Sequence, residues 1–167
     1  MGRDKALLPY EGSTLAGTIA TRVREAAGNV TLIGDTAHAS QPGFGVQADL
    51  IASCGPMGGV YTALNITQAD WNLIVACDMP RVTAAFMLGL FAAAEEFDAD
   101  ALVPATGDKL HPLCAVYHRR VLGAVEESLA RRSLKMHDLL SRIHLVRWPV
   151  TAAEIMKNVN TPADWTV

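Results

Sequence analysis

Hydrophobic residues recur along the chain with two alternating periods. In residues 15–27, apolar side chains return at about every fourth position, which is typical of the buried face of an α-helix. Ser13 or Thr14 would cap the start of this helix, and Gly28 lies just past its end. Residues 71–77 (WNLIVAC) are instead apolar almost throughout, which predicts a strand buried on both faces of a parallel sheet.

The remaining apolar segments divide in the same way into short extended runs and longer helical ones. Further strands are expected at residues 30–33, 44–48, 101–103, 113–117 and 145–148, and further helices at 58–69, 83–96, 119–131, 135–143 and after residue 162. Because strands and helices alternate with short connections, we expect an α/β fold with a doubly wound, mostly parallel sheet. No repeat, linker or low-complexity tract divides the sequence, so we expect residues 1–167 to form a single domain.

Composition and charge exclude several classes of protein. With 50% hydrophobic and 19% charged residues, the sequence is too apolar for a disordered chain. The net charge of −3 gives no general attraction to nucleic acid or to an anionic membrane, and no apolar run reaches the roughly 18 residues of a membrane-spanning helix. The three cysteines are far apart and include no Cys-x-x-Cys pair, so we expect reduced thiols and a cytoplasmic location.

Asp78 is the strongest single candidate for chemistry. Ligands of doubly wound sheets bind outside the carboxyl ends of the strands. Asp49 follows one extended stretch, Asp78 follows another, and Asn160 lies in a polar segment near the end of the chain. Asp78 emerges from the most apolar strand, and Pro80 prevents that strand from continuing. A carboxylate there fits Mg²⁺, which often takes one or two carboxylates together with substrate phosphates. The alternative is a turn residue that caps backbone N–H groups.

Two further segments could contact an anion. Arg3 and Lys5 lie beside Gly2, which suits a phosphate, although basic residues near a terminus are commonly just solvated. The loop CGPMGG at residues 54–59 runs into a helix N-terminus, whose N–H groups favour an anion or a base-edge acceptor. The same loop could equally be a tight turn from strand to helix.

The pattern of histidines and cysteines indicates neither a zinc site nor a serine hydrolase. His111, Cys114 and His118 form the only tight group, but His111 would point to the opposite face of the strand and no fourth ligand lies nearby. The sequence contains no Gly-x-Ser-x-Gly elbow. Of the five histidines, we expect only His111, in the loop before a strand, to contact a ligand.

Five short motifs occur in a defined order along the chain. They are MGRDKALL at residues 1–8, GPMGGV at 55–60, ACDMP at 76–80, HPLC at 111–114 and NVNTPAD at 158–164. With these motifs the chain resembles the molybdenum cofactor guanylyltransferases along essentially its whole length. The resemblance implies a Rossmann-like fold of the nucleotide-diphospho-sugar transferase type.

The resemblance also implies a reaction. GMP would be transferred from GTP to the terminal phosphate of the molybdenum-molybdopterin cofactor, giving the molybdopterin guanine dinucleotide cofactor and pyrophosphate. Lys5 and Asp78 would be the catalytic residues, because Lys5 would neutralise the triphosphate and Asp78 would hold Mg²⁺. Asp49 would contact the guanine nucleotide, while Gly55 and Gly59 would shape its pocket.

The resemblance further implies a second subsite and protein partners. The residues expected to face the pterin are Lys109, His111, Asn158 and Asn160. The substrates would be GTP and the molybdopterin cofactor, and the protein partners would be molybdopterin-synthesis proteins and apo-molybdoenzymes. No nucleic acid and no membrane are expected among the partners.

One departure from the family pattern concerns the N-terminus. The pattern begins with a strand and a loop of the type LAGGxSxRMGxDK, whereas this sequence starts at the Met-Gly of that pattern. We therefore expect an N-terminally truncated domain that lacks roughly a dozen residues, namely the central first strand and the glycine-rich phosphate loop. Either a start codon assigned too late or a fragment with impaired activity would explain this, and the first is favoured because the downstream motifs keep the pattern.

Other functions stay open at this point. They are a molybdopterin cytidylyltransferase, a sugar-phosphate nucleotidylyltransferase of similar architecture, and a non-catalytic nucleotide-binding remnant. The NVNTP segment at residues 158–162 and the loop at Gly55 favour the guanylyltransferase over the other enzymes. Lys5 and Asp78, which are both retained, argue against the remnant.

Overall fold

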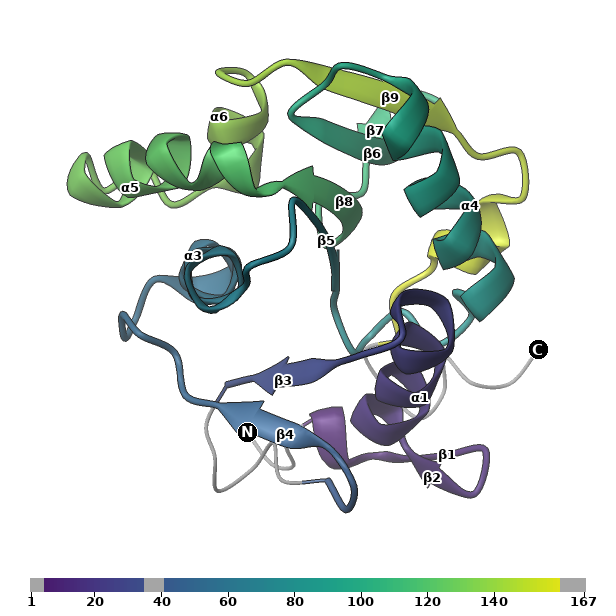
Figure 1. The fold of residues 1–167 in the computed structure, drawn as a ribbon. Helices are drawn as coiled ribbons and strands as arrows, with labels where there is room; N and C mark the ends of the chain where they lie inside the picture. The colour runs from purple at the N-terminus through teal and green to yellow at the C-terminus, as the bar shows by residue number, and fades with distance from the viewer. Residues whose placement is uncertain (1–4, 35–40, 160–167) are drawn as a thin grey trace.

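The computed structural model describes residues 5–34 and 41–159, and its strands fall into separate groups (Figure 1). A five-stranded sheet has the order β5-β8-β6-β7, with β9 paired to β6. A second group pairs β3 with β4, and a small hairpin pairs β1 with β2. The strands are β1 (Pro9–Tyr10), β2 (Ser13–Thr14), β3 (Thr31–Ile33), β4 (Gly45–Gln47), β5 (Trp71–Val75), β6 (Ala101–Thr106), β7 (Lys109–Leu110), β8 (Cys114–His118) and β9 (Leu145–Pro149).

The expected α/β alternation with parallel strands is present, and antiparallel neighbours accompany those strands. Only β3–β4 and β6–β9 are parallel among the described strand pairs, and the others are antiparallel. Strands β5, β6 and β9 each follow a helix and point in one direction, as helical crossovers require. Strand β8 instead returns on β6 through the β6–β7 turn at Gly107, and such a short connection can only produce an antiparallel neighbour.

Strands β7 and β8 act as one interrupted partner of β6. Ala101 of β6 pairs with β8 and β9, while Ala105 pairs with β7 and β9, so β7 and β8 lie on the same side of β6. The interruption at residues 111–113 has the character of a bulge, a feature that often lies beside functional sites.

Helix α1 (Leu15–Ala27) confirms the expected bounds and caps. The side chain of Thr14 accepts a hydrogen bond from the Gly17 N–H at 3.0 Å, which satisfies a donor of the first turn. Gly28 has a φ of 77° and its N–H donates to the Arg24 carbonyl, so the helix ends in a left-handed cap that favours glycine.

Four other helices and the short η2 agree with the sequence pattern to within a few residues. They are α3 (Gly55–Ile66), α4 (Ala84–Glu96), η2 (Arg119–Val121), α5 (Leu122–Ala130) and α6 (Met136–Leu140). The sequence pattern did not predict two further short helices, η1 (Lys5–Leu7) and η3 (Ala153–Met156). Helix α3 begins three residues earlier than expected, because Pro56 fits a first helical turn, where its missing N–H costs no hydrogen bond. The helix expected after residue 162 lies outside the described residues. None of the described helices is long and apolar enough to cross a membrane.

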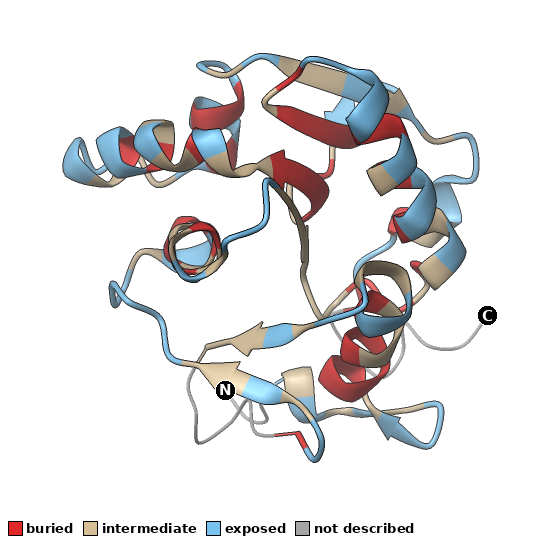
Figure 2. Cartoon of the chain, viewed as in Figure 1, coloured by how far each residue is buried: buried red, intermediate tan, exposed pale blue. Residues whose placement is uncertain are grey.

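The core lies on the two faces of β6 and β8. Alternate residues Val103 and Tyr117 face the side covered by α3, α5 and α6, whereas Leu102 and Val116 face α4. Figure 2 shows this region as the main buried part of the sheet. The fully buried Tyr117 hydroxyl donates to the Pro112 carbonyl at 2.8 Å, so its polar atom is satisfied.

A slot separates the two groups of strands. β3 and β5 are not paired with each other, and every residue of β5 is only half buried. Two adjoining cavities, of about 370 and 390 Å³, lie between β3 and β5 and are flanked by α1 and α3. The residues that line both cavities are Val23, Val30, Thr31, Ile33, Ala63 and Leu73. The two strand groups therefore face each other across a mostly apolar space.

Candidate active site

Asp78 lies in the turn that follows β5, at the carboxyl end of the strand, as the sequence predicts. The chain after η3 packs directly on this turn. The Asn158 side-chain amide donates to Asp78 Oδ2 at 3.1 Å, and the Val159 N–H donates to the Asp78 carbonyl at 2.7 Å. Residues 80 positions apart in sequence therefore form one polar unit.

The Asp78 carboxylate retains one unused oxygen. Its Oδ1 is buried and has no hydrogen-bond partner among the described residues. Burial raises the pKa of Asp78 above its ordinary value, although the hydrogen bond from Asn158 and the charge of Lys5 act in the opposite direction. A cation that bound Oδ1 would remove this unfavourable desolvation of the carboxylate.

This donor set fits magnesium. Mg²⁺ prefers oxygen ligands and needs only one or two carboxylates when substrate phosphates and water complete its coordination. Among residues 5–34 and 41–159, no group of three or more His, Cys, Asp or Glu side chains could hold a metal alone. A metal at Asp78 would therefore depend on a phosphorylated ligand for its other contacts.

Lys5 is close enough to Asp78 for its charge to lower the Asp78 pKa. The residues that follow it are hydrogen-bonded to α1. The Leu15 N–H donates to the Leu8 carbonyl at 2.9 Å, and the Thr18 hydroxyl donates to the Tyr10 carbonyl at 3.3 Å. Helix α1 thus supports the segment that places a cation beside the carboxylate.

Asp49 lies exposed in the loop before α3. The Leu50 N–H donates to the Thr62 hydroxyl at 3.0 Å, and that hydroxyl donates to the Gly58 carbonyl at 2.9 Å, which connects this loop to α3. A Cβ on Gly58 would lie 3.9 Å from Asp49 Oδ1, so the carboxylate is close to the first turns of the helix. Cys54, at the helix N-cap, makes no side-chain cap hydrogen bond.

Gly55 and Gly59 shape the start of α3 in different ways. Gly55 has a φ of 53°, a left-handed conformation in which a side chain is strained. Gly59 lines the 370 Å³ cavity, and a Cβ there would meet nothing within 4 Å. A side chain at Gly59 would therefore be free to project into the cavity.

One cavity brings the predicted segments together. The 370 Å³ cavity is lined by Ala6, Gly59 and Cys77, which are at or next to Lys5, the start of α3 and Asp78. A larger cavity of about 490 Å³ lies between residues 51–54 and the end of α5, and no predicted site residue is among those that line it.

His111 occupies the interruption between β7 and β8. Its Nε2 is hydrogen-bonded to the Thr106 hydroxyl at 2.9 Å, and its backbone N–H donates to the Pro104 carbonyl at 2.9 Å. Burial lowers the His111 pKa, and the charge of the nearby, exposed Lys109 lowers it further, so both favour the uncharged ring. The structure gives His111 a partner within its own hairpin, and its predicted contact with a ligand stays a prediction.

Of the two asparagines predicted to face the pterin, the structure describes only Asn158. Asn158 is exposed and contacts Asp78, which links the two predicted subsites more closely than the sequence indicates. Asn160 lies outside the described residues. The hairpin that carries His111 also lies near this point, because the Ala76 N–H donates to the Leu113 carbonyl at 2.7 Å.

Arg22 of α1 contacts the loop after Asp78, which the sequence does not indicate. Its guanidinium donates to the carbonyls of Pro80 and Val82, which are 58 and 60 residues away in sequence. A single arginine on an amphipathic helix carries no signal for such contacts, because its partners are backbone atoms that only the tertiary fold brings near.

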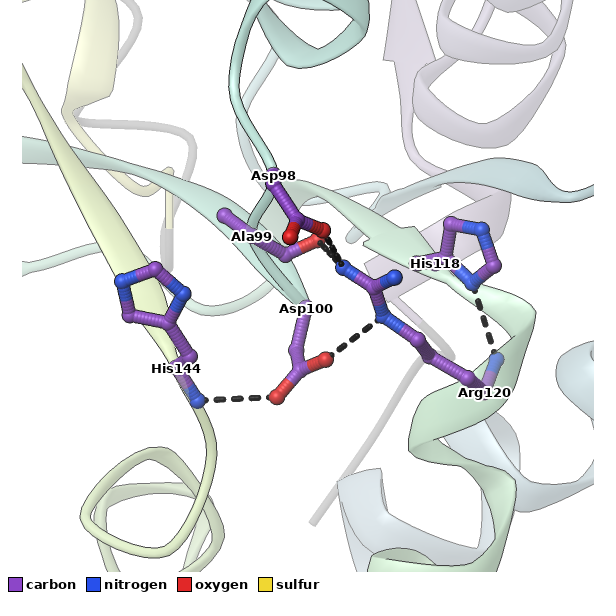
Figure 3. Close-up of polar contacts among 6 residues, drawn as sticks. All are labelled: Asp98, Ala99, Asp100, His118, Arg120 and His144. Carbon is purple, nitrogen blue, oxygen red and sulfur yellow. Dashed lines mark hydrogen bonds and ion pairs between the residues drawn. The ribbon is translucent and has the colours of Figure 1, made fainter.

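A second polar cluster lies at the opposite end of the sheet, before β6 begins (Figure 3). Arg120 Nε donates to Asp100 Oδ1 at 2.7 Å, and its terminal nitrogen donates to Asp98 at 3.0 Å. The His144 N–H donates to the other Asp100 oxygen at 2.9 Å. Burial opposes ionisation of Asp100, but these hydrogen bonds outweigh it and lower the Asp100 pKa. Both oxygens of Asp100 are satisfied, which is typical of a structural cluster.

Comparisons with known proteins agree with this architecture. Residues 1–146 match the sequence model of the MobA-like NTP transferase domain. The chain is similar to a protein of Carboxydothermus hydrogenoformans named "Probable molybdenum cofactor guanylyltransferase", with 30% identity over 99% of this chain and 86% of that protein.

Solved structures show the same fold. Molybdopterin-guanine dinucleotide biosynthesis protein A of Archaeoglobus fulgidus superimposes with a TM-score of 0.81 and 24% identity, over 98% of this chain and 87% of that one. The 2-C-methyl-D-erythritol 4-phosphate cytidylyltransferase of Thermus thermophilus superimposes with a TM-score of 0.73 and 17% identity, over 96% of this chain and 89% of that one. The expected Rossmann-like nucleotidyltransferase fold is confirmed, and the chain belongs to the family of MobA-like NTP transferase domains.

Proposed function

We propose that this protein is a molybdenum cofactor guanylyltransferase, which transfers GMP from GTP to the terminal phosphate of molybdenum-molybdopterin and releases pyrophosphate. The single observation that carries the proposal is Oδ1 of Asp78, which is buried at a strand end beside the charge of Lys5 and has no hydrogen-bond partner among the residues that the structure describes. The name of the Carboxydothermus hydrogenoformans relative supports the same reaction.

The reaction needs positioning and charge neutralisation more than a protein nucleophile. An oxygen of the substrate's terminal phosphate forms the new bond to the α-phosphorus of GTP, and the bond from that phosphorus to the bridging oxygen breaks as pyrophosphate leaves. Lys5 would bind the triphosphate and offset its negative charge. Asp78 would hold Mg²⁺, which supplies Lewis-acid activation of the α-phosphate when it is bound.

The start of α3 would bind the nucleotide. Asp49 would contact the guanine nucleotide, and Gly55 and Gly59 would leave room for it at the helix start. Lys109, His111, Asn158 and Asn160 would face the pterin. Because Asn158 also donates to Asp78, it would align the carboxylate with the second substrate. Molybdopterin-synthesis proteins and apo-molybdoenzymes would be the partners, and the three free cysteines support a reducing, cytoplasmic location.

A cytidylyltransferase is the second candidate, because the Thermus thermophilus structure with this fold carries that name. The two functions differ in the base that the pocket selects. We would titrate the protein with GTP, CTP and ATP in the presence of Mg²⁺ and measure pyrophosphate release with molybdopterin. Selective binding and turnover of GTP are expected, whereas selective use of CTP would establish the cytidylyltransferase instead.

Asp78→Ala tests the catalytic assignment. Loss of the metal contact should reduce turnover by about 10³-fold, since metal-ion stabilisation of a transition state is worth several kcal/mol. Asp70→Ala is a matched control, because Asp70 lies at the other end of β5 and accepts hydrogen bonds from Arg119 and Asn72 through its backbone carbonyl, which the substitution keeps. Turnover that survives Asp78→Ala would remove Asp78 from the active site.

A further inference from the structure

Arg22 contacts two segments that are far apart in sequence. On one side its guanidinium donates to the Pro80 carbonyl and, at 3.2 Å, to the Val82 carbonyl. On the other side it forms an ion pair with Glu11 at 2.8 Å, in the turn between β1 and β2. The Arg22 side chain is only 20% exposed, so these contacts are partly shielded from water.

These two segments carry the charged groups of the candidate active site. Pro80 follows Asp78 by two residues, and Glu11 belongs to the hairpin that follows Lys5. Both segments rest on α1, the helix that contains Arg22. A shift of either segment would change the separation between the ammonium group of Lys5 and the carboxylate of Asp78.

We infer that Arg22 is a positioning residue that fixes the turn after Asp78 relative to the Lys5 segment, so that the two charges are spaced for one metal-bound triphosphate. The inference rests on the proposed function. Arginine suits this task because its planar guanidinium presents several donors in fixed directions, which a lysine ammonium does not.

The first measurement needs no substrate. The Val82 N–H donates to the Met79 carbonyl at 3.2 Å, so amide hydrogen exchange at Val82 reports on the order of the turn. Arg22→Met keeps most of the apolar stem but removes every donor, and should speed exchange at Val82 by about 10- to 100-fold, as loss of charged hydrogen bonds implies. Arg22→Lys should recover part of the protection.

Arg24→Met is the matched control. Arg24 lies on the same helix, and its guanidinium stacks over the Phe44 ring at 4.7 Å rather than on the Asp78 turn. Arg24→Met removes the same charge from α1 but leaves the contacts of Arg22 in place. Amide exchange at Val82 should therefore stay at the level of the unsubstituted protein. Equal acceleration in both variants would indicate general loss of helix stability and would overturn the inference.

The second measurement follows the metal site. Mn²⁺ takes the same oxygen ligands as Mg²⁺ and can be titrated by electron paramagnetic resonance in the presence of GTP. Arg22→Met should weaken Mn²⁺ binding by about 10- to 100-fold, as is typical when support for a metal ligand is lost, while Arg24→Met leaves it unchanged. Unchanged binding in Arg22→Met would overturn the inference.

Asp78→Asn separates this inference from the proposed function. If the unsubstituted protein and Asp78→Asn bind Mn²⁺ and GTP equally, the proposed metal site itself is wrong, and the positioning role fails with it. If Asp78→Asn abolishes binding while Arg22→Met does not alter it, the metal site holds and only the role of Arg22 is overturned.

Discussion

The two halves of the molecule are held together by different interactions. Around β6 and β8, nearly every strand residue is buried between helices on both faces of the sheet (Figure 2). Around β3 and β5, each strand is half buried or exposed and borders the slot. There, a smaller apolar cluster that joins Ile19 of α1 to Val82 is supplemented by single hydrogen bonds between distant segments, such as Val159 to Asp78. Stability is therefore concentrated in one half and candidate chemistry in the other, as is common for binding regions.

The sharpest test of this difference uses the same substitution in both halves. Leu102 is fully buried in β6, so Leu102→Ala should lower the free energy of unfolding by about 2–5 kcal/mol. Leu32, in β3, is half buried and lines the slot, so Leu32→Ala should lower it by no more than about 1 kcal/mol. Urea denaturation measures both values, and equal losses would contradict the contrast.

A substitution in the open half should instead affect binding. Asp49→Asn should weaken GTP affinity by about 10- to 100-fold, because hydrogen bonds to a charged group are worth about 1.5–3 kcal/mol. The Asp49 side chain is exposed, so the unfolding midpoint should not change. Calorimetric titration with GTP is the measurement, and an unchanged affinity would remove Asp49 from the nucleotide site.

Asp78→Asn should stabilise the metal-free protein. Because burial raises the pKa of Asp78 above 3.8, the folded state binds this proton more tightly than the unfolded state does. Ionisation of Asp78 therefore lowers the free energy of unfolding as pH rises from 3.8 through the folded pKa. The uncharged amide of Asn at position 78 does not have this effect. Thermal unfolding at pH 7 without metal should show a higher midpoint for the variant, and a lower one would contradict the burial argument.

The smallest expected effect concerns the cluster at Asp100. Its folded pKa is below 3.8, so its contribution to stability is fully present above pH 3.8 and is lost as pH falls further. Asp100→Asn should lower the unfolding midpoint slightly at pH 7 and flatten its dependence on pH below 3.8. The effect should shrink with added salt, because the Arg120 and Asp98 side chains are exposed to solvent.

The sequence contains enough information to place the local elements of the fold. The caps at Thr14 and Gly28 define α1 because both act on backbone groups within one turn. Asp78 could likewise be assigned to a strand end, since an apolar run followed by Pro80 has few other structures available. The direction of β8 could not be predicted, because it depends on a two-residue strand, β7, that has too few residues to show a period.

The sequence by itself determined the periodic helices, the buried strands and the residue types suited to a phosphate and a metal. Only the tertiary structure decided that Asn158 contacts Asp78 and that Arg22 donates to the Pro80 carbonyl in the loop after Asp78. The reason is physical: periodicity and capping arise from contacts between residues a few positions apart, and are therefore visible in sequence. The contacts of Asn158 with Asp78 and of Arg22 with Pro80 join segments 58 or more residues apart, and they exist only once the sheet and α1 have packed.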